Sequence, residues 1–231
     1  MKTTMIERGL LWTGGGVFVA SLGLAAYMIG FAWPAAAPLA PDGITVAVAV
    51  NAFLFITFAL HHSLLARERV KAWLTRALPV RLLRSVYVWT ASLLFAVTLI
   101  YWHPIGHVVY QAPRWLSPFL YAFQAAGLAL IVSAARMIDA LELAGIRSGA
   151  KDTLVIRGPY RLVRHPLYLG WLLIVWGSPL MTGDRLMFAV LSSAYLFLAM
   201  PWEERSMART LGTDYERYRS IVRWRVLPYL Y

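Results

Sequence analysis

No cysteine occurs among the 231 residues of this chain. This absence excludes disulfide bonds, cysteine nucleophiles and thiolate metal sites. Charged residues are also scarce, at 14% of the chain, whereas a soluble domain has about a quarter. Hydrophobic residues reach 60%, so the composition excludes a soluble domain and indicates a membrane protein.

The apolar residues are concentrated in long runs without charged side chains. Four of these runs cover residues 10–33, 44–66, 85–102 and 116–135. Since about 20 apolar residues span a bilayer as a helix, each run predicts one transmembrane helix. A cleaved signal peptide is the alternative for the first run, but its 24 uncharged residues exceed the apolar core of such a peptide.

A fifth apolar run, residues 167–202, is too long for one span. Pro179 and the polar turn residues 183–185 interrupt it. Because proline and glycine mark turns, the run predicts two short helices joined by a tight turn. The sequence therefore predicts six transmembrane helices, of which the last two form a short helical hairpin.

The predicted fold class is all-α, as a polytopic membrane protein with a single membrane domain over residues 1–231. Four spans lie in residues 1–135, and a second part covers residues 153–231. A cytoplasmic amphipathic helix follows the last span, with a break expected at Gly212. Its apolar face is formed by residues that recur at helical spacing, namely Met207, Leu211, Tyr215, Tyr218 and Val222.

Basic residues outnumber acidic residues by 22 to 11 and are unevenly distributed. Residues 66–84, residues 136–166 and the tail after Trp202 each carry six Lys or Arg. By the positive-inside rule these segments face the cytoplasm, which places both termini there and agrees with six spans. The net charge of +11 then reflects topology and attraction to anionic lipids, so we expect no nucleic-acid partner.

The segment 157–170 places three arginines, a histidine and two tyrosines directly before an apolar run. Pro166 disfavours the helical conformation at His165 and starts a helix. We therefore expect the N–H groups of residues 168–170 to be unpaired donors at a helix start, suited to a carboxylate. The alternative is a membrane-entry segment with arginines on lipid phosphates and tyrosines as interfacial anchors.

Two adjacent carboxylates, Glu203 and Glu204, follow the last apolar run. Desolvation is costly at such a place, and carboxylates there suit hydroxyl donors, amines or a cationic ligand. The alternative is a structural role, because acidic residues are favoured in the first turn of the tail helix.

Histidines occur at two membrane boundaries. His61 and His62 end the second run, where a histidine is a functional hypothesis by default, either as a base or as a substrate-orienting group. Packing between helices is the alternative. His103 and His107 share a helix face by their spacing of four, but they lie at the opposite membrane surface, and we predict no metal site.

These motifs together resemble a known family. The motifs are Gly158-Pro159-Tyr160-Arg161-x-x-Arg164-His165-Pro166-x-Tyr168-x-Gly170 and Glu203-Glu204 followed by Leu211-Gly212-x-x-Tyr215-x-x-Tyr218. They are similar to those of integral-membrane methyltransferases related to isoprenylcysteine carboxyl methyltransferase, over residues 153–228. The two motifs occur in the family's order around a helical hairpin, which makes the resemblance specific.

A narrower resemblance is to the bacterial methanethiol S-methyltransferase branch and its NnrU-like neighbours. It rests on His62-Ser63-x-x-Ala66-Arg67, Arg84-Ser85-x-Tyr87 and Ser178-Pro179-x-Met181-Thr182. Residues 138–145 are less aromatic than this branch leads us to expect, and they lie near its substrate entrance.

The resemblance implies S-adenosylmethionine as the methyl donor, held on the cytoplasmic side of a bacterial inner membrane. The residues that it assigns to the donor are Tyr160, Arg164, His165, Tyr168, Leu169, Gly170, Glu203, Glu204, Tyr215 and Tyr218. The bases available to take the acceptor proton are His61, His62 or one of the two glutamates, and we predict His62, Arg67 and Glu204 as the catalytic residues.

The leading functional hypothesis is methylation of a small thiol, converting methanethiol into dimethyl sulfide. A second hypothesis is methylation of an isoprenylcysteine carboxyl group or of another lipophilic acceptor from the bilayer. Two further hypotheses are a haem- or metal-binding NnrU-like membrane protein and a structural subunit without catalysis.

Overall fold

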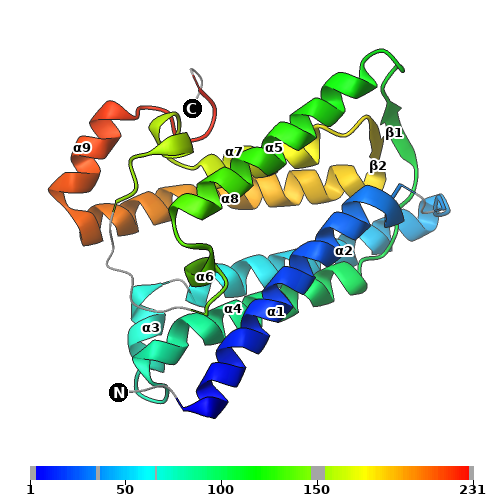
Figure 1. The fold of residues 1–231 in the computed structure, drawn as a ribbon. Coiled ribbons are helices and arrows are strands. Elements are labelled where there is room, and N and C mark those ends of the chain that lie inside the picture. The colour runs from blue at the N-terminus through cyan, green and yellow to red at the C-terminus, as the bar shows by residue number, and fades with distance from the viewer. Residues whose placement is uncertain (1–3, 35–36, 66, 147–153, 229–231) are drawn as a thin grey trace. The chain divides into compact units, whose positions relative to one another are not determined.

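The computed structural model describes residues 4–34, 37–65, 67–146 and 154–228 (Figure 1). The chain divides into two compact units, the first from residues 1–107 and 141–150 and the second from residues 108–140 and 151–231. Residues 66 and 153, which the sequence analysis placed in a motif and at a boundary, lie outside the described residues.

The first unit is helical. Its elements are α1 (Met5–Tyr27), which continues as the π-helix η1 (Met28–Ala32), α2 (Pro41–Leu65), α3 (Glu68–Leu74), α4 (Val80–Ile100) and α6 (Ala140–Leu143), which begins at the boundary. The helix α4 packs along both α1 and α2 (Figure 1). The short helix α3 lies between α2 and α4, and Pro79 is the N-cap residue of α4.

Two polar contacts fix these helices against one another. The Trp89 indole donates to the Leu10 carbonyl at 2.9 Å and covers Gly14, where a Cβ would lie 2.6 Å from the indole nitrogen. Beyond the end of α4, the fully buried Asn51 side chain donates to the His103 carbonyl at 2.9 Å and accepts from the His103 backbone N–H at 2.8 Å. Because both amide groups are used, this buried asparagine joins α2 to the chain after α4 without an unsatisfied polar group.

The second unit contains the remaining elements. They are β1 (Val108–Gln111), α5 (Ser117–Met137), the 3-10 helix η2 (Gly158–Arg161), α7 (Pro166–Trp176), β2 (Leu180–Thr182), α8 (Gly183–Leu211) and α9 (Thr213–Ile221). The fourth predicted span, α5, thus belongs to the second unit, where it lies along α7 (Figure 1). The mostly helical fold class is confirmed, while the single membrane domain stays a prediction.

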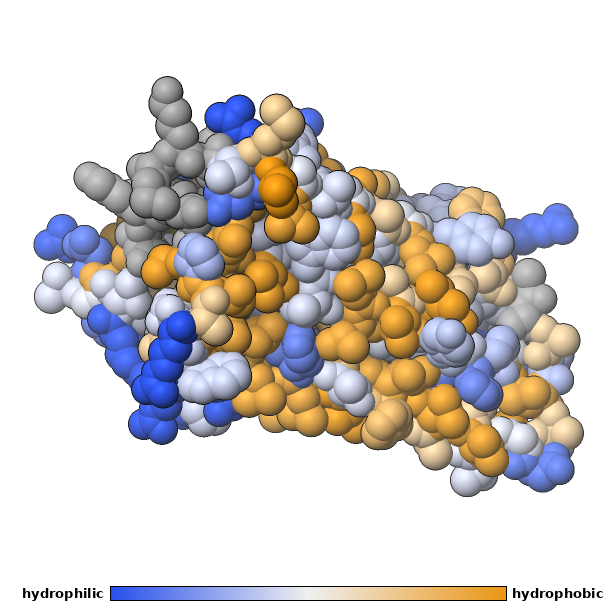
Figure 2. Space-filling view, turned by 90° about the horizontal axis from the view of Figure 1, so that it is seen from below, coloured by the Kyte–Doolittle hydropathy of each residue, from blue (hydrophilic) through white to orange (hydrophobic). Residues whose placement is uncertain are grey.

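Five helices are long and apolar enough to cross a membrane: residues 5–32, 41–65, 82–100, 117–137 and 183–211. At most 39% of the residues in their apolar windows are buried within the protein. Hydrophobic side chains accordingly cover much of the face seen in Figure 2. Apolar helices with exposed sides are typical of contact with lipid, so the protein is a multi-pass membrane protein.

The predicted final hairpin differs from the structure in its second arm. α7 is short, with 11 residues, or roughly 16 Å at 1.5 Å per residue, about half of the hydrocarbon core. α8 is not short: it has 29 residues and continues through Pro201, Glu203 and Glu204 to Leu211. The prediction that the second arm ends near Trp202 is therefore wrong, because a proline within a long helix removes one hydrogen bond without ending the helix.

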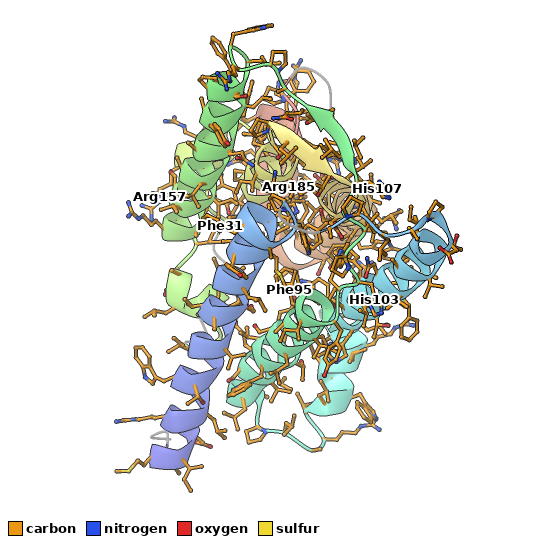
Figure 3. The ribbon with its side chains drawn as sticks, turned by 90° about the vertical axis from the view of Figure 1, so that its right-hand side faces the viewer. Phe31, Phe95, His103, His107, Arg157 and Arg185 are labelled. Atoms are coloured by element: carbon orange, nitrogen blue, oxygen red, sulfur yellow. The ribbon has the colours of Figure 1, made fainter. Side chains whose placement is uncertain are left out.

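The turn between the two arms contains the strand β2, which forms a small sheet with β1, and this sheet was not predicted. β1 and β2 pair antiparallel, and Tyr110 donates to the Ser178 carbonyl at 2.9 Å. The Arg185 guanidinium donates to Ser178 Oγ at 2.7 Å and also to the Leu180 carbonyl, beside β2 (Figure 3). Arg185 therefore stabilises the turn that reverses the chain between α7 and α8.

Two glycines bring α5 and α7 into close contact. A Cβ at Gly127 would lie 2.5 Å from the Gly170 carbonyl oxygen, and a Cβ at Gly170 would lie 2.6 Å from the Gly127 carbonyl oxygen. Real Cβ atoms do not approach backbone oxygens so closely. The glycine at position 170 is therefore explained by helix packing, as in small-residue contacts between membrane helices.

We expect Gly127→Ala to lower the free energy of unfolding by about 1–3 kcal/mol, because the added methyl forces α5 and α7 apart. The matched control is Gly16→Ala on α1, where nothing lies within 4 Å of the added Cβ. That variant should be neutral or slightly stabilising, since alanine favours a helix by about 0.5–1 kcal/mol over glycine. Denaturant titration of both variants in detergent tests this; equal stability would contradict the packing argument.

Candidate functional site

The two sequence motifs meet in a buried ion pair. Arg164 Nε donates to Glu204 Oε1 at 2.7 Å, and each side chain is only 6% exposed. The residues are 40 positions apart, Arg164 just before α7 and Glu204 within α8. A buried charge is stable only when it is paired and hydrogen-bonded, so each motif depends on the other for its charge partner.

The chain that follows α9 completes the surroundings of Arg164. Its Nη1 donates to the carbonyls of Val222 at 2.8 Å and Arg223 at 2.7 Å. Its backbone N–H donates to the Trp224 carbonyl at 2.9 Å, and the His165 N–H donates to the Arg225 carbonyl at 2.8 Å. The guanidinium thus has partners on both sides, and two backbone hydrogen bonds join residues 164–165 to residues 224–225.

Glu204 accepts hydrogen bonds from several groups. Besides Arg164, Arg225 Nε donates to Oε2 at 3.1 Å, and His165 Nε2 lies 3.4 Å from Oε1. Its two oxygens are therefore already engaged within the protein, and Glu204 organises the cationic side chains around it.

Glu203 has a different environment although it is the next residue. Its side chain is 47% exposed and accepts a short hydrogen bond from the Tyr168 hydroxyl. His165 Nδ1 lies 3.7 Å from Glu203 Oε2, and the His165 ring stacks on the Tyr168 ring at a centroid distance of 5.2 Å. Glu203 is therefore the carboxylate of the pair that can still reach a ligand.

The predicted unpaired donors at the start of α7 are not present. The N–H groups of Tyr168 and Leu169 both donate to the His165 carbonyl at 3.1 Å. The expectation that these two N–H groups are unpaired is wrong, because the His165 carbonyl is their acceptor. Tyr168 contributes through its side chain instead. A role for Leu169 and Gly170 in donor binding stays a prediction.

The predicted tyrosines pack behind the ion pair. Tyr215 and Tyr218 are buried in a cluster with Val222, and Tyr218 donates to the Tyr160 carbonyl at 2.7 Å. Burial raises the pKa of the Tyr160 and Tyr215 hydroxyls to about 12, and it also raises the pKa of Tyr218. All three hydroxyls are therefore protonated at neutral pH. The hydrogen bond from Tyr218 joins α9 to η2.

An open pocket of about 420 Å³ adjoins the ion pair. It is lined by Arg164, Arg219, Arg223, Trp224 and Arg225. The last four residues, and the carbonyl partners of Arg164, were not among the predicted site residues. In the sequence, the arginines of this tail indicate only that it faces the cytoplasm. No sequence pattern indicates that they lie near Arg164.

The predicted catalytic residues His62 and Arg67 belong to the first unit. The Tyr87 hydroxyl lies 2.8 Å from His62 Nε2, and the Phe58 ring packs on the imidazole at 5.6 Å. Arg67 is exposed at the start of α3. Their participation in catalysis stays a prediction, and Tyr87 is the polar partner that the structure adds to His62.

His103 and His107 contact backbone carbonyls. His103 Nδ1 lies 3.1 Å from the Tyr101 oxygen, and His107 Nε2 lies 2.8 Å from the Leu39 oxygen (both histidines are labelled in Figure 3). In the part of the chain that the structure describes, no three His, Asp or Glu side chains form a group that could hold a metal ion.

The chain is similar to known methyltransferases. The family model for phospholipid methyltransferases matches residues 119–214, which include Arg164 and Glu204. A methanethiol S-methyltransferase of Mycobacterium tuberculosis is 34% identical over 233 residues, covering 88% of each chain. That of Crocosphaera subtropica is 32% identical over 188 residues, covering 77% of this chain and 74% of the relative.

The similarity also extends to a eukaryotic protein. Nurim of Sus scrofa is 31% identical over 189 residues, covering 74% of this chain and 72% of nurim. No solved structure matches.

Proposed function

The chain belongs to the integral-membrane methyltransferase family that includes the methanethiol S-methyltransferases, and on this premise we propose that it transfers a methyl group from S-adenosylmethionine to a small thiol. The acceptor that we propose is methanethiol, and the product is dimethyl sulfide. The names of the relatives support the acceptor, and the chemistry of the site supports the donor.

One observation carries the proposal: a half-exposed carboxylate, Glu203, lies beside a buried arginine–glutamate network between the start of α7 and the interior of α8. S-adenosylmethionine combines an ammonium, ribose hydroxyls and a sulfonium, and a carboxylate binds each kind of group. We assign ligand binding to Glu203 with Tyr168. We assign to Glu204 the positioning of Arg164, His165 and Arg225, because its oxygens are already engaged.

The donor supplies a methyl group on a positively charged sulfur. When the acceptor sulfur takes this methyl, the S–H proton must leave. We assign that proton to His62, whose imidazole is held by Tyr87. A site with little water favours methyl transfer from sulfonium to thiolate because opposite charges are neutralised. The exposed apolar sides of the helices allow a volatile thiol to arrive through the bilayer.

We expect the purified protein to bind S-adenosylmethionine in calorimetry and to release dimethyl sulfide from methanethiol, detected by gas chromatography. His62→Gln should lower turnover about 100-fold at neutral pH, the lower end of the range for a lost base. Part of that activity should return at alkaline pH, where the thiol ionises without help. His61→Gln on the same helix is the matched control.

Three results would contradict parts of this proposal. An intact, folded protein that does not bind S-adenosylmethionine would reject the donor. Turnover with a prenylcysteine analogue or a phenol but not with methanethiol would replace the small thiol by a lipophilic acceptor. A Soret band or stoichiometric metal in an inactive preparation would favour the haem- or metal-binding alternative.

A further inference from the structure

The arginine-lined pocket next to the ion pair has more cationic groups than the network behind it uses. Arg164 and Arg225 both donate to Glu204. Arg219 lies 3.6 Å from Glu216, one turn away on α9, in a pair that is about half exposed. Among the described residues, no carboxylate lies within ion-pair distance of the exposed Arg223.

Arg219 and Arg223 therefore present guanidinium donors to the open pocket. An exposed arginine paired at 3.6 Å gains little from its partner, so Arg219 can turn to a stronger anion. The backbone of Arg223 is fixed because its carbonyl accepts from the buried Arg164 at 2.7 Å. A rigid backbone beneath an arginine lowers the entropy that is lost when the guanidinium binds an anion.

The chemistry of the lining selects the ligand. Guanidinium groups match phosphate because each presents parallel N–H donors to two oxygens. A pocket of about 420 Å³ holds a phosphate group together with a small headgroup. The shared chemistry is therefore that of a phosphate mono- or diester, which occurs both on membrane lipids and on soluble metabolites.

The surroundings of the pocket favour a lipid. Ile221, between two of the pocket arginines in sequence, is 67% exposed. Trp224 lines the pocket itself, and tryptophan is enriched at the level of lipid headgroups. The predicted topology puts this tail on the cytoplasmic side, where anionic lipids attract basic residues. A soluble phosphate would gain nothing from an exposed apolar side chain in this segment.

We propose that the pocket lined by Arg219 and Arg223 binds the phosphate of an anionic phospholipid and attaches the segment after α9 to the membrane surface. The bound lipid lies beside the donor site and stabilises the segment whose carbonyls hold Arg164. The proposal concerns lipid binding alone and does not depend on methyl transfer.

Native mass spectrometry of the full-length protein in detergent, titrated with phosphatidylglycerol or phosphatidylcholine, tests this. We expect phosphatidylglycerol to bind at least tenfold more tightly. Arg223→Gln should weaken that binding roughly fivefold, and the Arg219→Gln/Arg223→Gln double variant roughly 25-fold. Arg217→Gln is the matched control, because it removes the same charge from an exposed position on α9 outside the pocket.

Equal binding of the two lipids, or an equal loss in Arg217→Gln, would overturn the proposal. If glycerol phosphate or inorganic phosphate bound as tightly as the lipid and displaced it, the ligand would be a soluble phosphate and not a lipid. Displacement by S-adenosylmethionine would assign the pocket to the methyl donor instead. Thermal unfolding of each variant shows whether a loss of lipid binding reflects misfolding. If the protein binds the lipid but not S-adenosylmethionine, this inference holds although the proposed function fails.

Discussion

Glu204→Gln will lower the free energy of unfolding by about 3 kcal/mol, because it leaves Arg164 buried without a counter-charge. Both side chains are 6% exposed, so water does not compensate for the lost partner. Arg225 donates to Oε2 and His165 lies beside Oε1, and glutamine keeps only one of these two acceptor oxygens. Denaturant titration in detergent measures the loss of stability, and calorimetry measures the accompanying loss of S-adenosylmethionine binding.

Glu203→Gln is the control for this prediction, since it removes the same charge one residue earlier. Its side chain is 47% exposed and contacts Tyr168, so unfolding should change by less than about 1 kcal/mol. Donor affinity should nevertheless fall, because we assign ligand binding to this carboxylate. Equal destabilisation by the two variants would show that Glu204 has no special structural role.

Arg164→Lys will lower the free energy of unfolding by about 2–4 kcal/mol although it keeps the positive charge. A lysine ammonium cannot reach Glu204 and the carbonyls of Val222 and Arg223 from one planar group. Buried carbonyls that lose their donor cost about 1–3 kcal/mol each. The same titration measures this loss, and donor binding should weaken with it because the segment after α9 loosens.

The matched control for this substitution is Arg161→Lys, three residues earlier in the same motif. Arg161 is exposed, and a surface change of this kind usually alters stability by no more than about 0.5 kcal/mol. If the two lysine variants unfold alike, the hydrogen bonds of Arg164 contribute nothing beyond its charge.

The long apolar runs were sufficient to predict most of the fold. Hydrophobicity sustained over some 20 residues leaves few alternatives to a membrane helix, and α1, α2, α4 and α5 lie where the runs predicted them. The end of α8 could not be predicted in the same way, because Pro201 and the following charges are typical of a helix boundary. The strands β1 and β2 are too short for a period-two pattern to indicate them.

The candidate site was only partly predictable. Conspicuous polar motifs identified Arg164 and Glu204, since charge beside an apolar run needs a partner. The different environments of Glu203 and Glu204 could not be inferred, because adjacent helix positions point about 100° apart and only packing decides which one is buried. The role of residues 222–225 depends on backbone carbonyls, which every sequence contains.

The hydrogen bond from Arg164 to the Val222 carbonyl joins residues 58 positions apart, and this spacing has a consequence for biosynthesis. At about 5–20 residues per second, the ribosome needs roughly 3 to 12 seconds to make the intervening chain. α7 and α8 are made during that interval, before the carbonyl partners of the arginine exist. Insertion into the membrane and closure of the site are therefore separate events, and a nascent chain stalled between them is inserted but unable to hold its methyl donor.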